Sequence, residues 1–235
     1  MARAQTRFGK FALGSISRVV GTVSQAETLV RLAAVTNRDC DIVEVRLDLI
    51  GSSTPQWVEH ARAIEARGLP VVVTIRLAGE GGQWKQPDEA RLALFETALR
   101  DLTAVDIEFR SPILKEVSTL AGRHERALIV SYHDFQRTPP IEDLRKVVAA
   151  AANFGSVVKI VTFTKTDEDV GILRTLLHDK SSTPLCVMGM GPLGPQTRVK
   201  FPKLGSCLAY GYLDAPVAPN QVPASDLMQR LKAPR

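Results

Sequence analysis

Short apolar runs rich in β-branched residues alternate along the chain with longer stretches whose apolar residues recur at helical spacing. The apolar runs predict strands at 18–23, 41–46, 71–76, 104–109, 127–132, 156–161, 185–190 and 207–211. The stretches between them predict helices, among them 25–36, 56–66, 88–102, 141–152 and 167–177. Because parallel strands need long crossover connections, this alternation indicates a parallel sheet with helices between its strands.

The alternation predicts an α/β fold in which eight βα units close into a single-domain (β/α)8 TIM barrel. A doubly wound open sheet is the alternative. Against it, Gly-Thr-Val-Ser at 21–24 stands where a dinucleotide-binding sheet carries its GxGxxG turn. No Pro-, Gly- or Ser-rich linker divides the chain, so we expect one barrel domain at 18–235 after a basic N-terminal extension at 1–17.

Several predicted strands carry polar side chains at alternate positions. The polar members are Glu44, Arg46, Thr74, Arg76, Asp106 and Glu108, and Asp48 continues the alternation past the end of the strand at 41–46. Since side chains of a strand alternate between its two faces, each of these strands has one polar face. In a barrel covered by helices that face points inward, and active residues lie at the carboxyl ends of the strands. An antiparallel sheet with one wet face is the alternative, which the intervening helices disfavour.

Two residues near the predicted strand ends could carry out chemistry. Lys159 is the only charge in an apolar strand, where loss of solvation favours the neutral amine that forms Schiff bases with ketones and aldehydes. The alternative is a lysine that extends its ammonium to water. His133 follows another apolar strand and suits acid–base catalysis near neutral pH, with a purely structural histidine as the alternative.

Two glycine-rich loops contain or precede a charged residue. Glu80 lies in Gly-Glu-Gly-Gly and could orient an imidazole through a carboxylate hydrogen bond. Arg198 follows Met-Gly-Met-Gly-Pro-Leu-Gly-Pro-Gln-Thr and could bind a carboxylate through two parallel hydrogen bonds. A flexible βα turn and a surface arginine are the respective alternatives.

The composition excludes several protein classes. With 45% hydrophobic and 23% charged residues, the 235-residue chain is neither collagenous nor disordered. No apolar run reaches the roughly 18 residues of a transmembrane helix. Cys40, Cys186 and Cys207 form no CxxC pair, and the histidines lack metal-ligand spacing. We therefore expect no metal site, and reduced thiols in a cytoplasmic protein.

The net charge of +5 arises largely at the start of the chain. Arg3, Arg7, Lys10 and Arg18 precede the first acidic residue, Glu27. A transit peptide is one interpretation of this start, and a frayed extension is the simpler one. The other charges are dispersed without a basic tract, so we expect neither a nucleic-acid nor a membrane partner.

Taken in order, these motifs resemble the type I 3-dehydroquinate dehydratases, over most of the chain from about Gly21 to Leu231. The matching segments are Glu44-Val45-Arg46-Leu47-Asp48, Thr74-Ile75-Arg76 with Glu80-Gly81-Gly82, Asp106-Ile107-Glu108, Ser131-Tyr132-His133-Asp134, Lys159-Ile160, Met188 and Met190, Thr197-Arg198, Gly205-Ser206, and Ala218-Pro219-Asn220-Gln221. Each pattern is short, and their joint order is what makes the resemblance specific.

The resemblance implies a (β/α)8 barrel that dehydrates 3-dehydroquinate to 3-dehydroshikimate by syn elimination, in the shikimate route to aromatic amino acids, without a metal or organic cofactor. It implies that Lys159 forms a Schiff base with the C3 ketone, that His133 is the general acid and base, and that Glu80 holds His133. It further implies that Arg198 pairs with the substrate carboxylate and that hydroxyl contacts come from Glu44, Arg46, Arg76 and Gln221. Family habit implies a homodimer.

Some positions depart from the family pattern. Val217 stands where the family often has serine, and Asn220 replaces a glycine in the closing loop. Phe109 is bulkier than expected after Asp-x-Glu. The segment after the Lys159 strand reads Thr-Phe-Thr at 162–164, where the family more commonly has a Met-Pro sequence. We therefore expect one substrate hydrogen bond to be lost at Val217 and loop closure to be altered at Asn220.

Two other functions stay open. One is a different Schiff-base lyase, such as a class I aldolase, against which Arg198 and the closing loop at 218–221 favour the dehydratase. The other is a catalytically silent barrel that binds a shikimate-like anion. The presence of Lys159, His133 and Glu80 together argues against a silent barrel, because binding alone would not need them.

Overall fold

Eight parallel strands form the centre of the molecule, each within two residues of its predicted bounds. The computed structural model describes residues 7–14, 16–52, 56–179 and 181–232. Along the sheet the strands follow the order β10-β3-β4-β5-β6-β7-β8-β9. They are β3 (Arg18–Val23), β4 (Ile42–Arg46), β5 (Val71–Thr74), β6 (Ala104–Glu108), β7 (Ala127–Asp134), β8 (Val157–Phe163), β9 (Leu185–Met190) and β10 (Leu208–Tyr212).

The ring of strands closes between β9 and β10, mainly through Ser206. The amide of Cys207 donates to the Leu185 carbonyl at 2.8 Å, and the Val187 amide donates to Ser206 Oγ at 3.0 Å. Ser206 Oγ in turn donates to the Leu208 carbonyl at 3.1 Å. A side chain thus replaces part of the backbone ladder at this seam. The predicted barrel is confirmed, and the open sheet is excluded.

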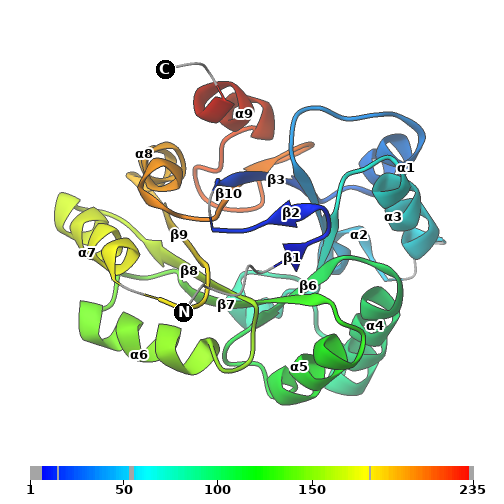
Figure 1. Ribbon diagram of the computed structural model, residues 1–235, viewed down its shortest axis with the longest axis horizontal. Helices are drawn as coiled ribbons and strands as arrows, with labels where there is room; N and C mark the ends of the chain where they lie inside the picture. The colour runs from blue at the N-terminus through cyan, green and yellow to red at the C-terminus, as the bar shows by residue number, and fades with distance from the viewer. Residues whose placement is uncertain (1–6, 15, 53–55, 180, 233–235) are drawn as a thin grey trace.

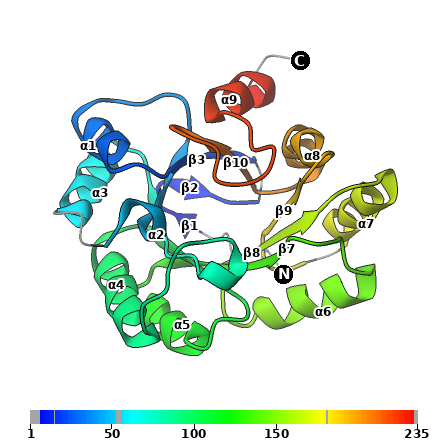
Figure 2. The same cartoon turned by 180° about the vertical axis from the view of Figure 1, so that it is seen from behind.

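Helices cover the outside of the barrel, between successive strands (Figures 1 and 2). They are α1 (Ala26–Ala34), α2 (Leu47–Ile50), α3 (Trp57–Ala66), α4 (Asp88–Asp101), α5 (Leu114–Arg123), α6 (Ile141–Ala151), α7 (Asp167–His178), α8 (Gly194–Lys200) and α9 (Ala224–Lys232), with 3-10 turns η1 (Ala78–Glu80) and η2 (Phe201–Leu204). The helix α7 begins with a capping box between Thr166 and Asp169. In the described part of the chain, no helix is long and apolar enough to cross a membrane.

Side-chain alternation divides the interior into two regions. Val43 and Val45 of β4 pack outward against the helices, whereas Ile42 packs inward with Val72 of β5 and Val157 of β8. Two residues further along these strands, the inward positions become polar: Ile42 is followed by Glu44, Val72 by Thr74, Ala104 by Asp106 and Val157 by Lys159. The amino-terminal half of the barrel is therefore an apolar core, and its carboxyl-terminal half holds charges, as the period-2 pattern predicts.

A short hairpin precedes the barrel and packs against its apolar end. Strands β1 (Arg7–Phe8) and β2 (Phe11–Ala12) pair antiparallel, with Gly9 in the left-handed region at φ +57°. Phe8 and Leu13 are buried in the cluster inside the barrel, and Figure 1 shows β1 and β2 within the ring. Residues 7–14 thus differ from the expected frayed extension because they bury two large apolar side chains. Residues 1–6 and 15 of that extension lie outside the described residues.

Candidate active site

The carboxyl ends of the strands surround a pocket of about 530 Å³, counting the part open to solvent. Its lining includes every residue that the sequence assigns to the site: Glu44, Arg46, Arg76, Glu80, His133, Lys159, Arg198 and Gln221. They come from β4, β7 and β8, from α8, and from the segments that follow β5 and β10. Parallel strands in a closed barrel place these ends together, which is why residues distant in sequence meet here.

Lys159 projects into the barrel from β8, because its neighbours Val158 and Ile160 face the helices. The residue is 5% exposed, and its Nζ lies 2.8 Å from Asp106 Oδ2 and 3.9 Å from Glu44 Oε1. Lys159 is therefore desolvated, as expected from the sequence, and its Nζ is paired with a carboxylate. Although burial acts to raise it, the charges of Arg76 and then Lys159 hold the pKa of Asp106 below its ordinary value.

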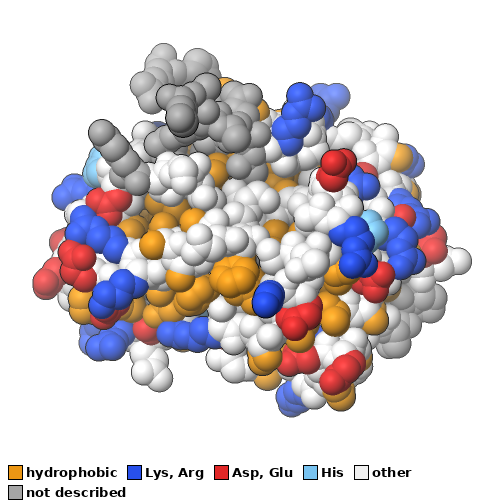
Figure 3. Space-filling view, turned by 60° about the horizontal axis from the view of Figure 1, so that its bottom comes forward, with side chains coloured by type: hydrophobic (Ala, Val, Ile, Leu, Met, Phe, Trp, Pro, Cys, Tyr) orange, Lys and Arg blue, Asp and Glu red, His pale blue; other side chains and the backbone are white. Residues whose placement is uncertain are grey.

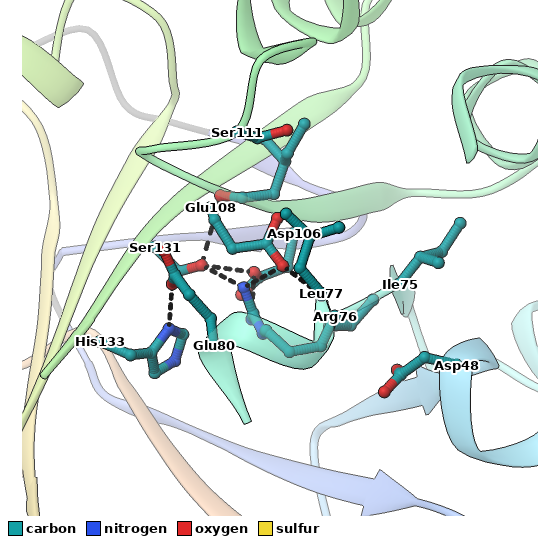
Figure 4. Close-up of polar contacts among 12 residues, drawn as sticks. Asp48, Ile75, Arg76, Leu77, Glu80, Asp106, Glu108, Ser111, Ser131 and His133 are labelled. Atoms are coloured by element: carbon teal, nitrogen blue, oxygen red, sulfur yellow. Dashed lines mark hydrogen bonds and ion pairs between the residues drawn. The ribbon is translucent and has the colours of Figure 1, made fainter. Parts of the chain in front are cut away.

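Arg76 joins the polar side chains of β6 and β7. Its Nη2 donates to Asp106 Oδ1 at 2.6 Å, and its Nη1 donates to Ser131 Oγ at 2.8 Å and lies 3.2 Å from Glu108 Oε1. Figure 4 shows the Arg76 guanidinium directed at these carboxylates. Ser131 Oγ also donates to Asp106 Oδ1 at 2.8 Å. The network holds the Asp106 carboxylate in place beside Lys159.

Arg91 extends this network from the helix α4. It is fully buried, it donates from Nε to the Ile75 carbonyl at 2.9 Å, and its Nη2 pairs with Glu108 Oε2. Glu108 therefore contacts two guanidinium groups, which offsets the desolvation of its charge. Sequence reasoning misses this role for Arg91, because an arginine in a helical stretch ordinarily faces solvent.

His133 and Glu80 form a second pair in the pocket. His133 Nδ1 lies 3.2 Å from Glu80 Oε2, a contact drawn as a dashed line in Figure 4. Burial, together with the charges of Arg76 and Lys159, lowers the pKa of His133 well below its ordinary value. Burial raises the pKa of Glu80 to about 7, against the opposing charge of Arg76. The imidazole is neutral at pH 7, and an Nδ1–H donated to Glu80 leaves Nε2 free to accept a proton.

The two glycines after Glu80 allow the loop to fold against the site. Gly81 has φ +78°, which favours glycine, and a Cβ on Gly81 would collide with the Phe135 ring. A Cβ on Gly82 would overlap the Arg76 carbonyl. The Glu-Gly-Gly sequence is thus needed to bring the Glu80 carboxylate to His133.

Arg198 differs from the other cations of the pocket in its partners. Its Nη1 donates to the Tyr210 carbonyl at 2.9 Å and contacts Met188 Sδ at 3.1 Å, while its buried Nε has no hydrogen-bond partner among the described residues. No carboxylate of the described chain lies within 4.0 Å of its guanidinium. Burial lowers the pKa of Arg198 to about 10. A buried guanidinium of this kind is suited to bind a carboxylate from a ligand.

Glu44 and Arg46 line the wall formed by β4. Glu44 accepts hydrogen bonds from Thr74 Oγ1 at 2.7 Å and Thr22 Oγ1 at 2.8 Å. Arg46 makes a bidentate pair with Asp48, from Nε to Oδ1 at 2.9 Å and from Nη2 to Oδ2 at 2.8 Å. These contacts fix both side chains before any ligand binds.

Gln221 closes one side of the pocket from the loop between β10 and α9. Its side-chain Oε1 accepts a hydrogen bond from the backbone amide of Val217 at 2.8 Å, and its backbone amide donates to the Ala218 carbonyl at 3.1 Å. Asn220 has φ +57°, in the left-handed region. Asparagine tolerates that region better than other non-glycine residues, so it can take the conformation of a glycine there.

Tyr210 also lines the pocket, although the sequence does not mark it as a site residue. Its strand reads Leu-Ala-Tyr-Gly-Tyr, which is typical of a core strand. Only the alternation of side chains along the strand, which directs position 210 into the barrel, could have indicated that Tyr210 lines the pocket. The sequence places Asp106 on a polar face without indicating a role for it.

The structure offers no metal centre among its described residues, where no group of three or more His, Cys, Asp or Glu side chains could hold an ion. Cys40, Cys186 and Cys207 are buried free thiols. Burial raises the pKa of Cys40 and Cys186 to about 12, so these thiols stay protonated and unreactive at neutral pH.

Comparison with known proteins agrees with this geometry. The family model described as type I 3-dehydroquinase matches residues 13–234. The 3-dehydroquinate dehydratase of Methanocella arvoryzae is 36% identical over 211 residues, covering 86% of this chain and 94% of that protein. The enzyme of that name from Methanosarcina mazei is 33% identical over 242 residues, covering 97% of this chain and all of the relative (100%).

Among solved structures, the 3-dehydroquinate dehydratase of Geobacillus kaustophilus superposes with a TM-score of 0.84 at 25% identity, covering 93% of this chain and 91% of that one. The similarity spans every element that contributes to the pocket, from β3 to α9. The chain therefore belongs to the type I 3-dehydroquinase family.

Proposed function

We propose that the protein catalyses the dehydration of 3-dehydroquinate to 3-dehydroshikimate through a Schiff base on Lys159. The observation that carries this proposal is the pairing of functions in one pocket. A buried lysine and a neutral imidazole lie there together with Arg198, a buried guanidinium for which the described chain provides no carboxylate. The substrate is a ketone that carries a carboxylate. The lysine and the imidazole suit the chemistry at the ketone, and the guanidinium suits the carboxylate.

In the first step, His133 takes a proton from Lys159, and the free Nζ adds to the C3 carbonyl carbon while a proton passes from the nitrogen to the carbonyl oxygen. His133 then returns its proton to the hydroxyl of the carbinolamine, which leaves as water, so that a protonated imine and a neutral imidazole remain. The positive charge on nitrogen then withdraws electrons from C2 and makes its hydrogens acidic. Asp106, 2.8 Å from Nζ in the free enzyme, is the anion placed to stabilise that charge.

In the second step, His133 accepts a proton from C2, and the electron pair forms an enamine. The enamine expels the C1 hydroxyl, which leaves as water after taking a proton from the His133 imidazolium. The product is a conjugated protonated imine, and water hydrolyses it to release the ketone and the Lys159 amine. The lowered pKa of His133 keeps its imidazole unprotonated and able to accept the proton, and the 3.2 Å contact of Nδ1 with Glu80 Oε2 supports a role for Glu80 in holding the ring.

The remaining lining residues would bind the substrate. Arg198 would pair with the carboxylate, and Glu44, Arg46, Arg76 and Gln221 would contact hydroxyl groups or shape the wall around them. Arg46 and Arg76 already donate to protein carboxylates, which keeps their guanidinium planes in fixed orientations. Preorganised partners of this kind reduce the entropy lost when a substrate binds.

The proposal is tested by turnover. Purified enzyme and 3-dehydroquinate should yield the conjugated product, followed by its ultraviolet absorbance and identified by NMR. His133→Ala should lower kcat by about 1000-fold, because it removes the acid–base group. His178→Ala, at the exposed end of α7, is the matched control with normal turnover. A wild-type protein that is folded by circular dichroism yet forms no product would refute the proposal.

An aldolase and a silent anion-binding barrel are separated from this function by the same assay. An aldolase would cleave a carbon–carbon bond and release two smaller carbonyl compounds, and a silent barrel would bind the substrate without changing its spectrum. The homodimer and the cytoplasmic location stay predictions, which size-exclusion chromatography with light scattering and cell fractionation would test.

A further inference from the structure

The aromatic ring of Tyr210 lies directly against the amine of Lys159. The Nζ atom is 4.1 Å from the ring centroid, and the two residues are 5% and 3% exposed. They face each other from β8 and β10, which lie on either side of β9, at inward positions of their strands. A cation at this distance from an aromatic face is attracted by the ring quadrupole, and most strongly where water is excluded.

The ring face of Tyr210, rather than its hydroxyl, makes this contact. The hydroxyl is buried and has no hydrogen-bond partner among the described residues. Burial raises the pKa of Tyr210 far above its ordinary value, so the phenol is neutral. The backbone of β10 is also held in place at Tyr210, because the Tyr210 carbonyl accepts a hydrogen bond from Arg198 of α8.

Conversion of Lys159 to a Schiff base changes what its nitrogen can bind. An ammonium has three N–H groups, whereas a protonated imine has one, so contacts that depend on N–H donation are reduced. Asp106 can accept the remaining N–H, since it already lies 2.8 Å from Nζ. An aromatic face needs no N–H, so it still attracts the cation after the imine has formed.

The other charges around Nζ act in both directions. Ionisable groups of the described chain that share this part of the barrel include Glu44, Arg46, Arg76, Glu80, Asp106, Glu108, His133, Cys186, Arg198 and Tyr210. The carboxylates favour a protonated imine, the guanidinium groups disfavour it, and the thiol and phenol are neutral. Binding of a substrate carboxylate at Arg198 would bring a further negative charge into the pocket.

We propose that the Tyr210 ring keeps the Schiff base on Lys159 protonated through a cation–π contact. This inference rests on the proposed function. A protonated imine is the form that withdraws electrons from C2, so loss of that proton on the alkaline side ends catalysis. Tyr210 thereby extends the pH range over which the enzyme–substrate complex reacts.

The test replaces Tyr210 by phenylalanine as the reference enzyme, and then by 4-fluoro-, 3,5-difluoro- and 3,4,5-trifluorophenylalanine through site-specific incorporation. Each fluorine withdraws electron density from the ring face while its shape is nearly kept. We expect the alkaline limb of the kcat–pH profile to move stepwise to lower pH, by about one pH unit from the reference to the trifluoro variant.

The same fluorinated residues at Phe201 are the matched control, because that side chain is buried in the helix-facing core and contacts no cation among the described residues. Their alkaline limb should stay where the wild type has it. An alkaline limb that does not move across the Tyr210 series, in an enzyme that turns over, would overturn the inference alone. A wild-type enzyme that forms no borohydride-stable adduct on Lys159 would refute the proposed function and this inference together.

Discussion

At the scale of single residues, Arg198 is distinguished by the partner that it lacks. Arg46, Arg76 and Lys159 each have a carboxylate within 4.0 Å, whereas Arg198 is equally buried and has none in the described chain. A buried cation without a counter-charge is costly, and a ligand carboxylate would offset that cost when it binds. The site is therefore built to gain affinity from an anion at this position.

Arg198→Ala should lower kcat/KM for 3-dehydroquinate by about 100-fold, mainly through a higher KM, because the substrate carboxylate loses its charged hydrogen-bond partner. Steady-state kinetics measures the effect. Lys200→Ala removes a positive charge from the exposed face of the same helix and is the matched control, with kinetic constants close to those of the wild type. Equal values for the two variants would exclude Arg198 from substrate binding.

The pair formed by His133 and Glu80 predicts a particular pH dependence. As the pH falls through about 7, Glu80 takes up a proton, and the Nδ1–H of His133 loses its charged acceptor. The imidazole then becomes a weaker base, so kcat/KM should decrease with an inflection near pH 7. The lowered pKa of His133 keeps the ring neutral through this range, so its own protonation does not cause the inflection.

Glu80→Gln keeps an oxygen acceptor but cannot ionise, and its kcat/KM should therefore show no inflection near pH 7. A pH titration of kcat/KM for both enzymes makes the comparison. Glu89→Gln, on the exposed side of α4, should keep the wild-type profile. An inflection of unchanged position in Glu80→Gln would assign the titration to another group.

At the scale of elements, the Ser206 hydroxyl supplements a backbone hydrogen bond, from Cys207 to Leu185, in closing the barrel at the seam of β9 and β10. Ser206→Ala leaves the buried Val187 amide without its acceptor and removes the donor to Leu208. We expect the free energy of unfolding to fall by about 1–3 kcal/mol, measured by urea denaturation. Ser118→Ala removes one exposed hydrogen bond to Phe154 from α5 and should change stability by less than about 0.5 kcal/mol. A similar small effect for Ser206→Ala would show that the backbone closes the seam unaided.

The strands and their polar faces can be predicted from the sequence because alternation with period 2 is a local signal. By itself, that alternation places Glu44, Thr74 and Asp106 inside the barrel, where they are buried. The hairpin of β1 and β2 cannot be predicted, because two-residue strands carry no periodicity and their stability comes from burial of Phe8 and Leu13. The helix α5 carries the same kind of local signal, because its buried residues Leu114, Val117 and Ala121 recur at helical spacing.

The site can be predicted as a set of residues but not as a network. Its motifs identify Lys159, His133 and Arg198, and all three line the pocket. The contact of Arg91 with Glu108 and that of Tyr210 with Lys159 depend on which helix and which strand face each other across the barrel. Single-sequence patterns do not contain that pairing.

At the scale of the whole molecule, the barrel separates stability from chemistry. Apolar side chains fill its amino-terminal half. Charged side chains occupy the carboxyl-terminal half, where ion pairs hold one another's side chains in fixed orientations. On the face shown in Figure 3, basic and acidic side chains are interspersed rather than gathered into a basic surface. The charges that the proposed reaction uses lie inside the pocket.

The most direct test of the account is reduction by sodium borohydride in the presence of 3-dehydroquinate, followed by peptide mass mapping. Hydride adds to the carbon of the protonated imine and converts it to a stable secondary amine, which records where the Schiff base formed. We predict one ligand-sized adduct, on Lys159, with loss of activity in proportion to its formation. Unmodified Lys159 with turnover intact, or an adduct confined to another lysine, would contradict the account.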